Sequence, residues 1–239
     1  MIGFGTLINT AAIIIGGIIG LYCGKIMKER YQNTIMKATG ICVIFIGIAG
    51  TIENMMTIQN GKIISNGTMM MITSIVIGSL IGEILDIELH IEQFGQWLKN
   101  KTGNTKDSSF VDAFVTASLT VCIGAMAIVG AIQDGIFGDY SILAIKAILD
   151  FIIILIMTSF MGKGCIFSAV PVGLLQGLIT ILAKSIQPFM TEQALHNISF
   201  VGSMLIFCVG INLIWEKTIK VANMLPSIII AVLFAFIAI

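Results

Sequence analysis

The sequence predicts an all-α fold: a polytopic membrane bundle of seven or eight transmembrane helices. Hydrophobic residues make up 57% of the 239 residues and charged residues only 11%, whereas about 25% of residues are charged in a soluble domain. The mean hydropathy is +1.03. Apolar runs of about 20 residues, the length a helix needs to cross the hydrocarbon core, recur along the whole chain. These observations indicate an integral membrane protein.

Eight apolar segments are expected to form the helices of this bundle. Their approximate bounds are 5–24, 37–57, 69–87, 112–133, 141–161, 165–184, 197–215 and 224–239. The eighth is short, and it begins near Pro226, a favourable residue for a first helical turn. Whether the eighth segment crosses fully or only dips into the membrane is left open. The short connections predict antiparallel neighbours in a single membrane domain over residues 1–239.

The distribution of positive charge predicts the orientation of the chain. If the loops alternate between the two faces, ten of the thirteen Lys and Arg residues, Lys106 and Lys217 among them, share one face. The positive-inside rule makes that face cytoplasmic and places the N-terminus outside. The first positive charges follow the first apolar run, so we expect a retained helix and not a cleaved signal peptide.

One cytoplasmic connection, residues 88–106, has the pattern of an amphipathic helix. Leu89, Phe94 and Trp97 recur at near-helical spacing, and Lys99 and Lys101 stand among the polar positions. Such a helix is typical of a membrane surface. An interfacial connector is the preferred interpretation, and a partner-binding helix is the alternative.

An internal repeat is suggested by two helices that run in the same direction. Residues 15–20 read IGGIIG and residues 77–82 read IGSLIG. The hairpins 5–57 and 69–134 are therefore expected to be duplicates. Many transporters are built from such repeats and place their site at the interface between them.

Small residues predict close helix packing. G-xxx-G pairs occur at residues 16 and 20, 78 and 82, and 173 and 177, and such pairs let helix backbones approach one another in lipid. The segment 122–135, CIGAMAIVGAIQDG, combines small residues with a polar end. We expect it to pack in the centre of the bundle.

Two ionisable residues fall inside one apolar segment. Asp150 lies near the middle of 141–161, and Lys146 precedes it by four residues on the same helical face. Charged residues within the membrane are costly, and they usually mark a functional site. Asp150 is therefore expected to be a midplane binding or proton-relay group with Lys146 as its tether. A purely structural ion pair is the alternative.

Further carboxylates gather at the predicted outer ends of the helices. Gln133 and Asp134 close the fourth segment, Asp139 precedes the fifth, and Glu53 lies at the corresponding end of the second. A ring of carboxylates favours cations. The alternative for each residue is a solvated helix end.

Two amides, Gln176 and Asn212, stand inside apolar runs and could coordinate a solute. Asn9, Thr10, Ser118 and Thr120 are further neutral polar residues at depth, with interhelical hydrogen bonds as their expected role.

Motifs of enzymes and metal sites are not found in the sequence. It contains no HExxH, GxSxG or phosphate-binding glycine loop, and the five cysteines form no CxxC pair. His90 and His196 fall at loop positions. We therefore expect no enzyme, cofactor or metal centre, and a net charge of zero gives no reason to expect nucleic-acid binding.

Four stretches resemble one protein family over nearly the whole chain. They are GTLINTAAIIIGGIIG, CIGAMAIVGAIQDG with the following DYSIL and KAILD, SAVPVGLLQG, and ANMLPSIIIA. This pattern resembles the YqgA/YdfK-like bacterial membrane proteins, known as domain of unknown function 554. The resemblance implies a multi-pass protein of the bacterial inner membrane and adds weight to the polar residues between 133 and 150. It implies no particular activity.

Taken together, the residues favour a transporter or channel for a small solute, most readily a cation. The alternative is a non-transporting scaffold or sensor that binds a partner through the 88–106 helix. The lipid bilayer is the one partner that the composition requires, and homo-oligomer formation is left open.

Overall fold

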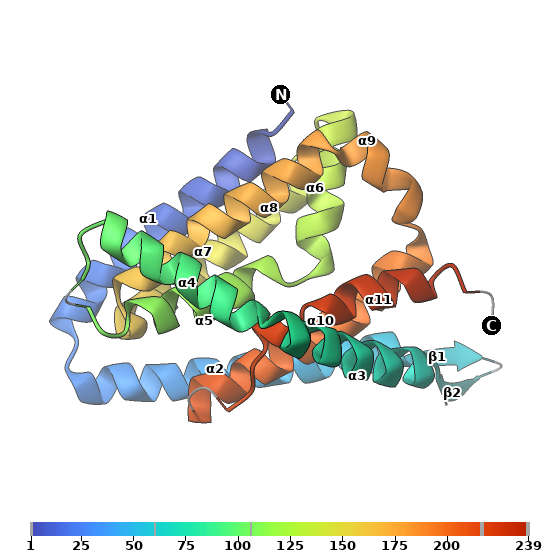
Figure 1. Cartoon of the computed structure of the whole chain (residues 1–239), viewed down its shortest axis with the longest axis horizontal. Coiled ribbons are helices and arrows are strands. Elements are labelled where there is room, and N and C mark those ends of the chain that lie inside the picture. The colour runs from blue at the N-terminus through green and yellow to red at the C-terminus, as the bar shows by residue number, and fades with distance from the viewer. Residues whose placement is uncertain (1, 60, 106, 216–217, 238–239) are drawn as a thin grey trace. The chain divides into compact units, whose positions relative to one another are not determined.

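The computed structural model describes residues 2–59, 61–105, 107–215 and 218–237, which are helical almost throughout (Figure 1). The chain divides into two compact units. Unit 1 contains Met1–Thr39, Leu89–Cys122 and Met126–Ile186, and unit 2 contains Gly40–Glu88, Ile123–Ala125 and Gln187–Ile239.

Unit 1 holds most of the candidate site. Its elements are α1 (Phe4–Ile26), the first part of α2 (Glu29–Met55), nearly all of α4 (Ile87–Lys101), α5 (Phe110–Cys122), α6 (Ala125–Phe137), α7 (Ser141–Met161), the 3-10 helix η1 (Lys163–Ser168), α8 (Ala169–Ile181) and α9 (Ala183–Ile186).

Unit 2 contains the remainder of α2 and a small hairpin. Its other elements are β1 (Met56–Gln59), β2 (Lys62–Ser65), α3 (Thr68–Leu85), η2 (Gln187–Phe189), α10 (Glu192–Trp215), η3 (Ala222–Met224) and α11 (Pro226–Phe234). The sequence did not predict the antiparallel hairpin, in which Met56 pairs with Ser65.

The predicted membrane bundle is confirmed. Six helices are long and apolar enough to cross a membrane, and a bent pair, α5 with α6, raises the number to seven within the described residues. The eighth predicted segment forms only the nine-residue helix α11. At 1.5 Å per residue, such a helix is about 13 Å long, too short to cross the hydrocarbon core. Residues 238–239 of that segment lie outside the described residues.

The fourth predicted span, 112–133, is not one continuous helix. Its two halves, α5 and α6, meet at an angle of 63°. Gly124, between them, has φ of 140°, a backbone conformation that residues with a side chain rarely adopt. The pattern of apolar residues is the same whether or not the helix breaks at Gly124. The sequence therefore did not predict the break.

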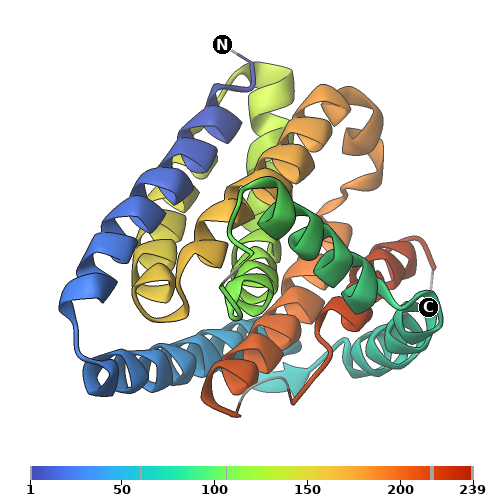
Figure 2. The same ribbon diagram turned by 60° about the vertical axis from the view of Figure 1, so that its left-hand side comes forward.

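In unit 1, α1 packs along α7 through glycines (Figure 1; Figure 2). A Cβ atom at Gly16 would lie 2.6 Å from the backbone oxygen of Phe151, and Gly20 faces the backbone of Leu155. The contacts advance together along both helices, so α1 and α7 are parallel. This close approach confirms the packing role expected for the first G-xxx-G pair.

In unit 2, glycines of α3 pack against the C-terminal segment. Gly78 meets Ser227, and Gly82 meets Asn223. These pairs run in opposite directions, so α3 is antiparallel to η3 and α11. The second G-xxx-G pair therefore also mediates close packing.

The third G-xxx-G pair behaves differently. A Cβ atom at Gly177 would meet no atom within 4 Å, whereas a Cβ atom at Gly173 would lie only 3.3 Å from the Thr10 hydroxyl oxygen. The expected close packing is therefore found at Gly173, against a side chain, but not at Gly177. The proposed duplication of the two hairpins stays a prediction. Their second helices differ in the structure, because α2 is continuous whereas α5 and α6 meet at a bend.

Candidate functional site

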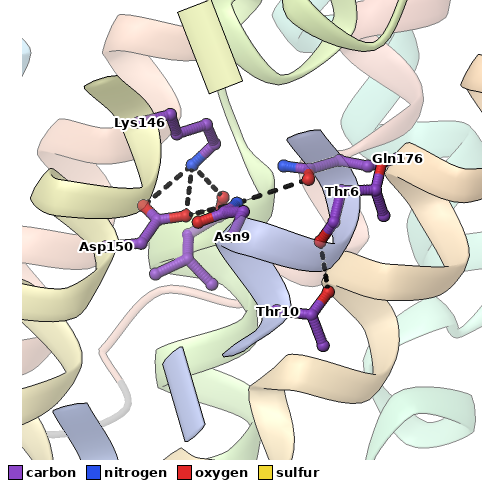
Figure 3. Close-up of polar contacts among 7 residues, drawn as sticks. Thr6, Asn9, Thr10, Lys146, Asp150 and Gln176 are labelled. Atoms are coloured by element: carbon purple, nitrogen blue, oxygen red, sulfur yellow. Dashed lines mark hydrogen bonds and ion pairs between the residues drawn. The ribbon is translucent and has the colours of Figure 1, made fainter. Parts of the chain in front are cut away.

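A buried polar cluster lies within unit 1, where four helices meet (Figure 3). Lys146 and Asp150 come from α7, Asn9 from α1, Gln176 from α8, and a backbone carbonyl at Val121 from α5. Residues far apart in the sequence are thus brought together by packing inside a single unit.

The ion pair is the centre of this cluster. Lys146 Nζ lies 2.8 Å from Asp150 Oδ1 and 2.7 Å from Oδ2, so it faces both carboxylate oxygens. The two residues are only 7% and 3% exposed. Asp150 is the tenth residue of the 21-residue helix α7, which places the pair near the middle of this span. The i,i+4 contact predicted from the sequence is present.

The same ammonium also binds the end of a helix. Lys146 Nζ donates to the backbone oxygen of Val121 at 2.8 Å. Val121 is the penultimate residue of α5, and the last four carbonyls of a helix have no partner within it. The break before α6 therefore exposes a carbonyl that Lys146 satisfies. The ion pair and the bend of the fourth span form one local structure.

Two amides extend the cluster from the carboxylate. Asn9 Nδ2 donates to Asp150 Oδ2 at 3.0 Å and to Gln176 Oε1 at 3.3 Å (Figure 3). Asn9 is fully buried, and Gln176 is 1% exposed. One side of the carboxylate thus faces a cation and the other a chain of neutral amides.

Several buried polar atoms of unit 1 have no hydrogen-bond partner among the described residues. Two of them, Asn9 Oδ1 and Gln176 Nε2, belong to the cluster itself. Two others, Thr6 Oγ1 and Ser118 Oγ, lie on α1 and α5, which contribute to the cluster. A buried polar atom without a partner costs about 1–3 kcal/mol. Packing alone does not account for such a concentration of polar atoms in a membrane bundle.

The predicted outer residue Asp134 lies elsewhere in unit 1. Its side chain is fully buried, and it accepts hydrogen bonds from the backbone N–H of Gly3 at 3.1 Å and of Gly5 at 3.0 Å. These donors belong to the start of α1, where N–H groups lack partners within the helix. Asp134 therefore caps α1 from a neighbouring helix. The neighbouring Gln133 is half-buried on α6.

The other two predicted outer carboxylates have separate surroundings. Asp139 is exposed and accepts from the backbone N–H of Ser141 at 3.0 Å and from its hydroxyl at 2.6 Å. These bonds from Ser141 hold the pKa of Asp139 below its usual value. Glu53 is exposed on α2 and belongs to unit 2. The structure of unit 1 thus gives Asp134 and Asp139 different tasks, and a shared ring of three carboxylates stays a prediction.

Asn212 belongs to unit 2. It donates to the backbone oxygen of Ile219 at 2.7 Å and accepts from the N–H of the same residue at 2.9 Å. Its contacts hold the chain that follows α10. Asn9 is a central member of the cluster, but the sequence analysis did not choose it as a site residue. In the sequence it is one of several neutral polar residues within apolar segments, and nothing in its spacing distinguishes it from the others.

The predicted amphipathic helix is present as α4. Phe94 stacks on Trp97 with ring centroids 5.7 Å apart and also contacts Phe114 of α5. Leu98 is buried, whereas Leu89 and Trp97 are 43% and 54% exposed. One face of α4 therefore packs against α5 within unit 1. Lys106, at the end of the predicted segment, lies outside the described residues.

The charge distribution needs one correction. Lys146 is one of the three Lys and Arg residues outside that group of ten, but it is buried in α7 and belongs to neither face. Lys217 lies outside the described residues. Residues that could hold a metal ion, in groups of three or more His, Cys, Asp or Glu, are not found in the part of the chain that the structure describes.

Comparison with known proteins places the chain among membrane proteins without an assigned activity. The family described as "Protein of unknown function (DUF554)" matches residues 4–236. The chain is 30% identical to the "Uncharacterized membrane protein YdfK" of Bacillus subtilis (strain 168), over 98% of this chain and 96% of that protein. It is 26% identical to the "Uncharacterized protein YqgA" of Escherichia coli (strain K12), over 95% and 94% of the two chains. No solved structure matches the chain.

Proposed function

The chain belongs to the DUF554 family of membrane proteins, and we propose that it transports a small cation across the membrane, with the Lys146–Asp150 cluster as the binding site. One observation carries this proposal. A buried ion pair, joined to two buried amides and to a helix end, lies at the middle of a spanning helix.

Stability alone is a weak reason to keep such a pair. Two charges lose their hydration on burial, and apolar residues of similar volume often stabilise a protein as well or better. Polar and ionisable residues within a membrane segment commonly mark the path of an ion or a proton. A break in a spanning helix, like that between α5 and α6, commonly exposes carbonyls that coordinate cations in transporters.

The remaining polar residues have supporting roles in this proposal. Gln133 and Asp139 would attract cations to the outer end of unit 1, and Glu53 would do the same in unit 2. Asp134 would hold α1 in place beside the path, and Asn212 would order the chain after α10. The protein would lie in the bacterial inner membrane with its N-terminus outside, as the distribution of Lys and Arg predicts.

Flux in proteoliposomes tests the proposal. Wild-type protein would be compared with Asp150→Asn for uptake of Na⁺, K⁺, H⁺ and Mg²⁺. We expect uptake of at least one cation, and we expect Asp150→Asn to lower it at least tenfold, because the carboxylate that binds Lys146 is lost. Glu83→Gln is the matched control. It removes an exposed ion pair with Lys220 in unit 2 and should leave uptake within twofold of wild type.

A second variant guards against misfolding. Asp150→Asn leaves the Lys146 ammonium buried without its partner, so the double variant Lys146→Met with Asp150→Asn would be measured beside it. It removes both charges and keeps the side-chain volume. Unchanged uptake in a folded, monodisperse variant of either kind would show that the cluster is not the path. No uptake of any cation by folded wild type would reject transport of these cations.

The second candidate function is a scaffold or sensor that binds a partner through α4. The exposed side chains of Leu89 and Trp97 favour it, since α4 is not one of the candidate spans. In that case Lys146–Asp150 would be a structural pair. Two results together would support it. Wild-type protein would show no flux, and a cellular phenotype would be lost when Phe94 and Trp97 are replaced but retained in Asp139→Asn.

A further inference from the structure

We propose that the cluster exchanges one monovalent alkali cation for one proton, with the ammonium of Lys146 as the built-in competitor of the cation. This inference rests on the proposed transport function and names its substrate class and its coupling. It follows from what surrounds the ammonium, from the charge of the cluster and from the atoms that are left without partners.

The surroundings of the ammonium are those of a cation site. Lys146 Nζ has three oxygen neighbours at 2.7–2.8 Å, two from Asp150 and one from the Val121 carbonyl. Carboxylate and carbonyl oxygens are the ligands that hard cations take in proteins. Both oxygens of Asp150 are engaged by the ammonium, so a cation can use this carboxylate only if Lys146 withdraws from it.

Further oxygens of the same helices are buried and lack partners within the described residues. They are Asn9 Oδ1, Thr6 Oγ1 and Ser118 Oγ. Asn9 already contacts Asp150 through its amide nitrogen. A rotation of its side chain by half a turn would direct Oδ1 to the same place, since the oxygen and nitrogen ends of an amide have nearly the same shape. Unit 1 thus holds neutral oxygen ligands beyond the three that bind the ammonium.

The net charge of the cluster selects the valence of the cation. The α1 and α8 helices face the pair with the neutral amides Asn9 and Gln176, and α5 contributes a carbonyl and, close enough to interact electrostatically, the Cys122 thiol. Asp150 is the one carboxylate among the described residues that contact the ammonium. A monovalent cation in place of the ammonium leaves the net charge unchanged, whereas a divalent cation would leave an excess buried positive charge, which is costly.

The proton balance follows from the fate of Lys146. A buried ammonium that has lost its carboxylate is strongly disfavoured, and a buried lysine can release its proton and remain as a neutral amine. The carboxylate with its ammonium partner takes up M⁺, and the products are the carboxylate with M⁺, a neutral Lys146 amine and one H⁺. No bond other than N–H breaks, no redox step occurs, and one positive charge leaves for each that enters.

Withdrawal of Lys146 would also release the end of α5. The Val121 carbonyl loses its contact with the ammonium when the cation displaces it, and Gly124 lies three residues further along the bend. Cation binding is thereby connected to the sharp break between α5 and α6.

The test measures protons and cations together in proteoliposomes. An imposed Na⁺ or K⁺ gradient should drive proton movement in the opposite direction through wild type, and a membrane potential set with an ionophore should change the rate less than twofold. Choline and Mg²⁺ should drive at least tenfold less proton movement. Lys220→Met, which removes an exposed lysine in unit 2, should behave like wild type.

Two substitutions of Lys146 separate exchange from a structural role. Arginine keeps the positive charge and can pair with Asp150 but does not release its proton. Lys146→Arg should therefore fold like wild type and lose exchange at least tenfold, whereas a merely structural ion pair would be preserved by Arg and leave exchange intact. Lys146→Met should carry no coupled proton, so any remaining cation movement should follow the membrane potential.

The outcomes distinguish this inference from the proposed function. Cation uptake by wild type without opposite proton movement would overturn the exchange and leave cation transport standing. Exchange that survives in Lys146→Arg would also overturn it. Absence of uptake of any cation by folded wild type would overturn both.

Discussion

Single carboxylates of this protein have different roles that depend on their neighbours. Asp150 pairs with an ammonium in the middle of α7, and Asp139 is exposed and binds the first turn of the same helix. Asp134 is fully buried but binds two backbone N–H groups in place of a cation. The residue type alone therefore does not indicate the role, and burial and partner have to be known.

A prediction at this scale concerns Asp134. The change Asp134→Ala leaves the N–H groups of Gly3 and Gly5 without their acceptor, and the free energy of unfolding should fall by about 1–3 kcal/mol. Asp134→Asn retains an acceptor oxygen and should be less destabilised. The measurement is the thermal transition of the purified protein in detergent.

Asp139→Ala is the matched control, because it removes an exposed carboxylate at the adjacent turn. Its transition should shift less than that of Asp134→Ala. Equal shifts in the two variants would show that the buried bonds to α1 do not stabilise the fold.

At the scale of elements, glycine determines how closely two helices approach, but the G-xxx-G spacing alone does not show where it does so. The pair at 16 and 20 lies against the backbone of α7, whereas Gly177 has open space around its Cα. The sequences of the two pairs have the same spacing. Which helix faces which neighbour is decided by packing, and the closeness of the backbones follows from it.

The two glycine environments predict opposite effects of one methyl group. Gly20→Ala would press a Cβ atom into the backbone oxygen of Leu155, and overpacking of this kind costs about 1–3 kcal/mol. Gly177→Ala meets open space and replaces glycine by a better helix former. We expect the thermal transition to fall for the first variant and to stay level or rise for the second. A loss of stability in Gly177→Ala as large as in Gly20→Ala would contradict the assigned packing.

At the scale of the whole molecule, the membrane class follows from composition, and the orientation is a prediction from charge. Ile63 in the hairpin and Lys101 at the end of α4 stand before and after the candidate span α3. The positive-inside rule places the first outside and the second in the cytoplasm.

Cysteine labelling in intact cells tests this orientation. In a background without the five native cysteines, Ile63→Cys should react with a membrane-impermeant maleimide. Lys101→Cys should react only after the cells are permeabilised. The reverse pattern would show that the N-terminus lies in the cytoplasm.

Much of the fold could be predicted because each spanning helix is a local property of the sequence. The predicted bounds of the fifth helix, 141–161, agree with α7, and the Lys146–Asp150 contact lies within one turn of that helix. The bend after α5 and the hairpin after α2 were not predicted. The first depends on the conformation of one glycine, and the second on exposed strand residues that the hydropathy pattern does not distinguish from a loop.

The sequence by itself determined that this is a helical membrane protein, approximately where its spans lie, and that one ion pair falls within a span. Apolar length and i,i+4 spacing are sufficient for these features, since both depend on neighbouring residues. Only the tertiary structure decided that Asn9, Gln176 and the carbonyl of Val121 join that pair, and that Asp134 caps α1. These contacts connect different helices, so they depend on how the helices pack and on which faces the small residues bring together.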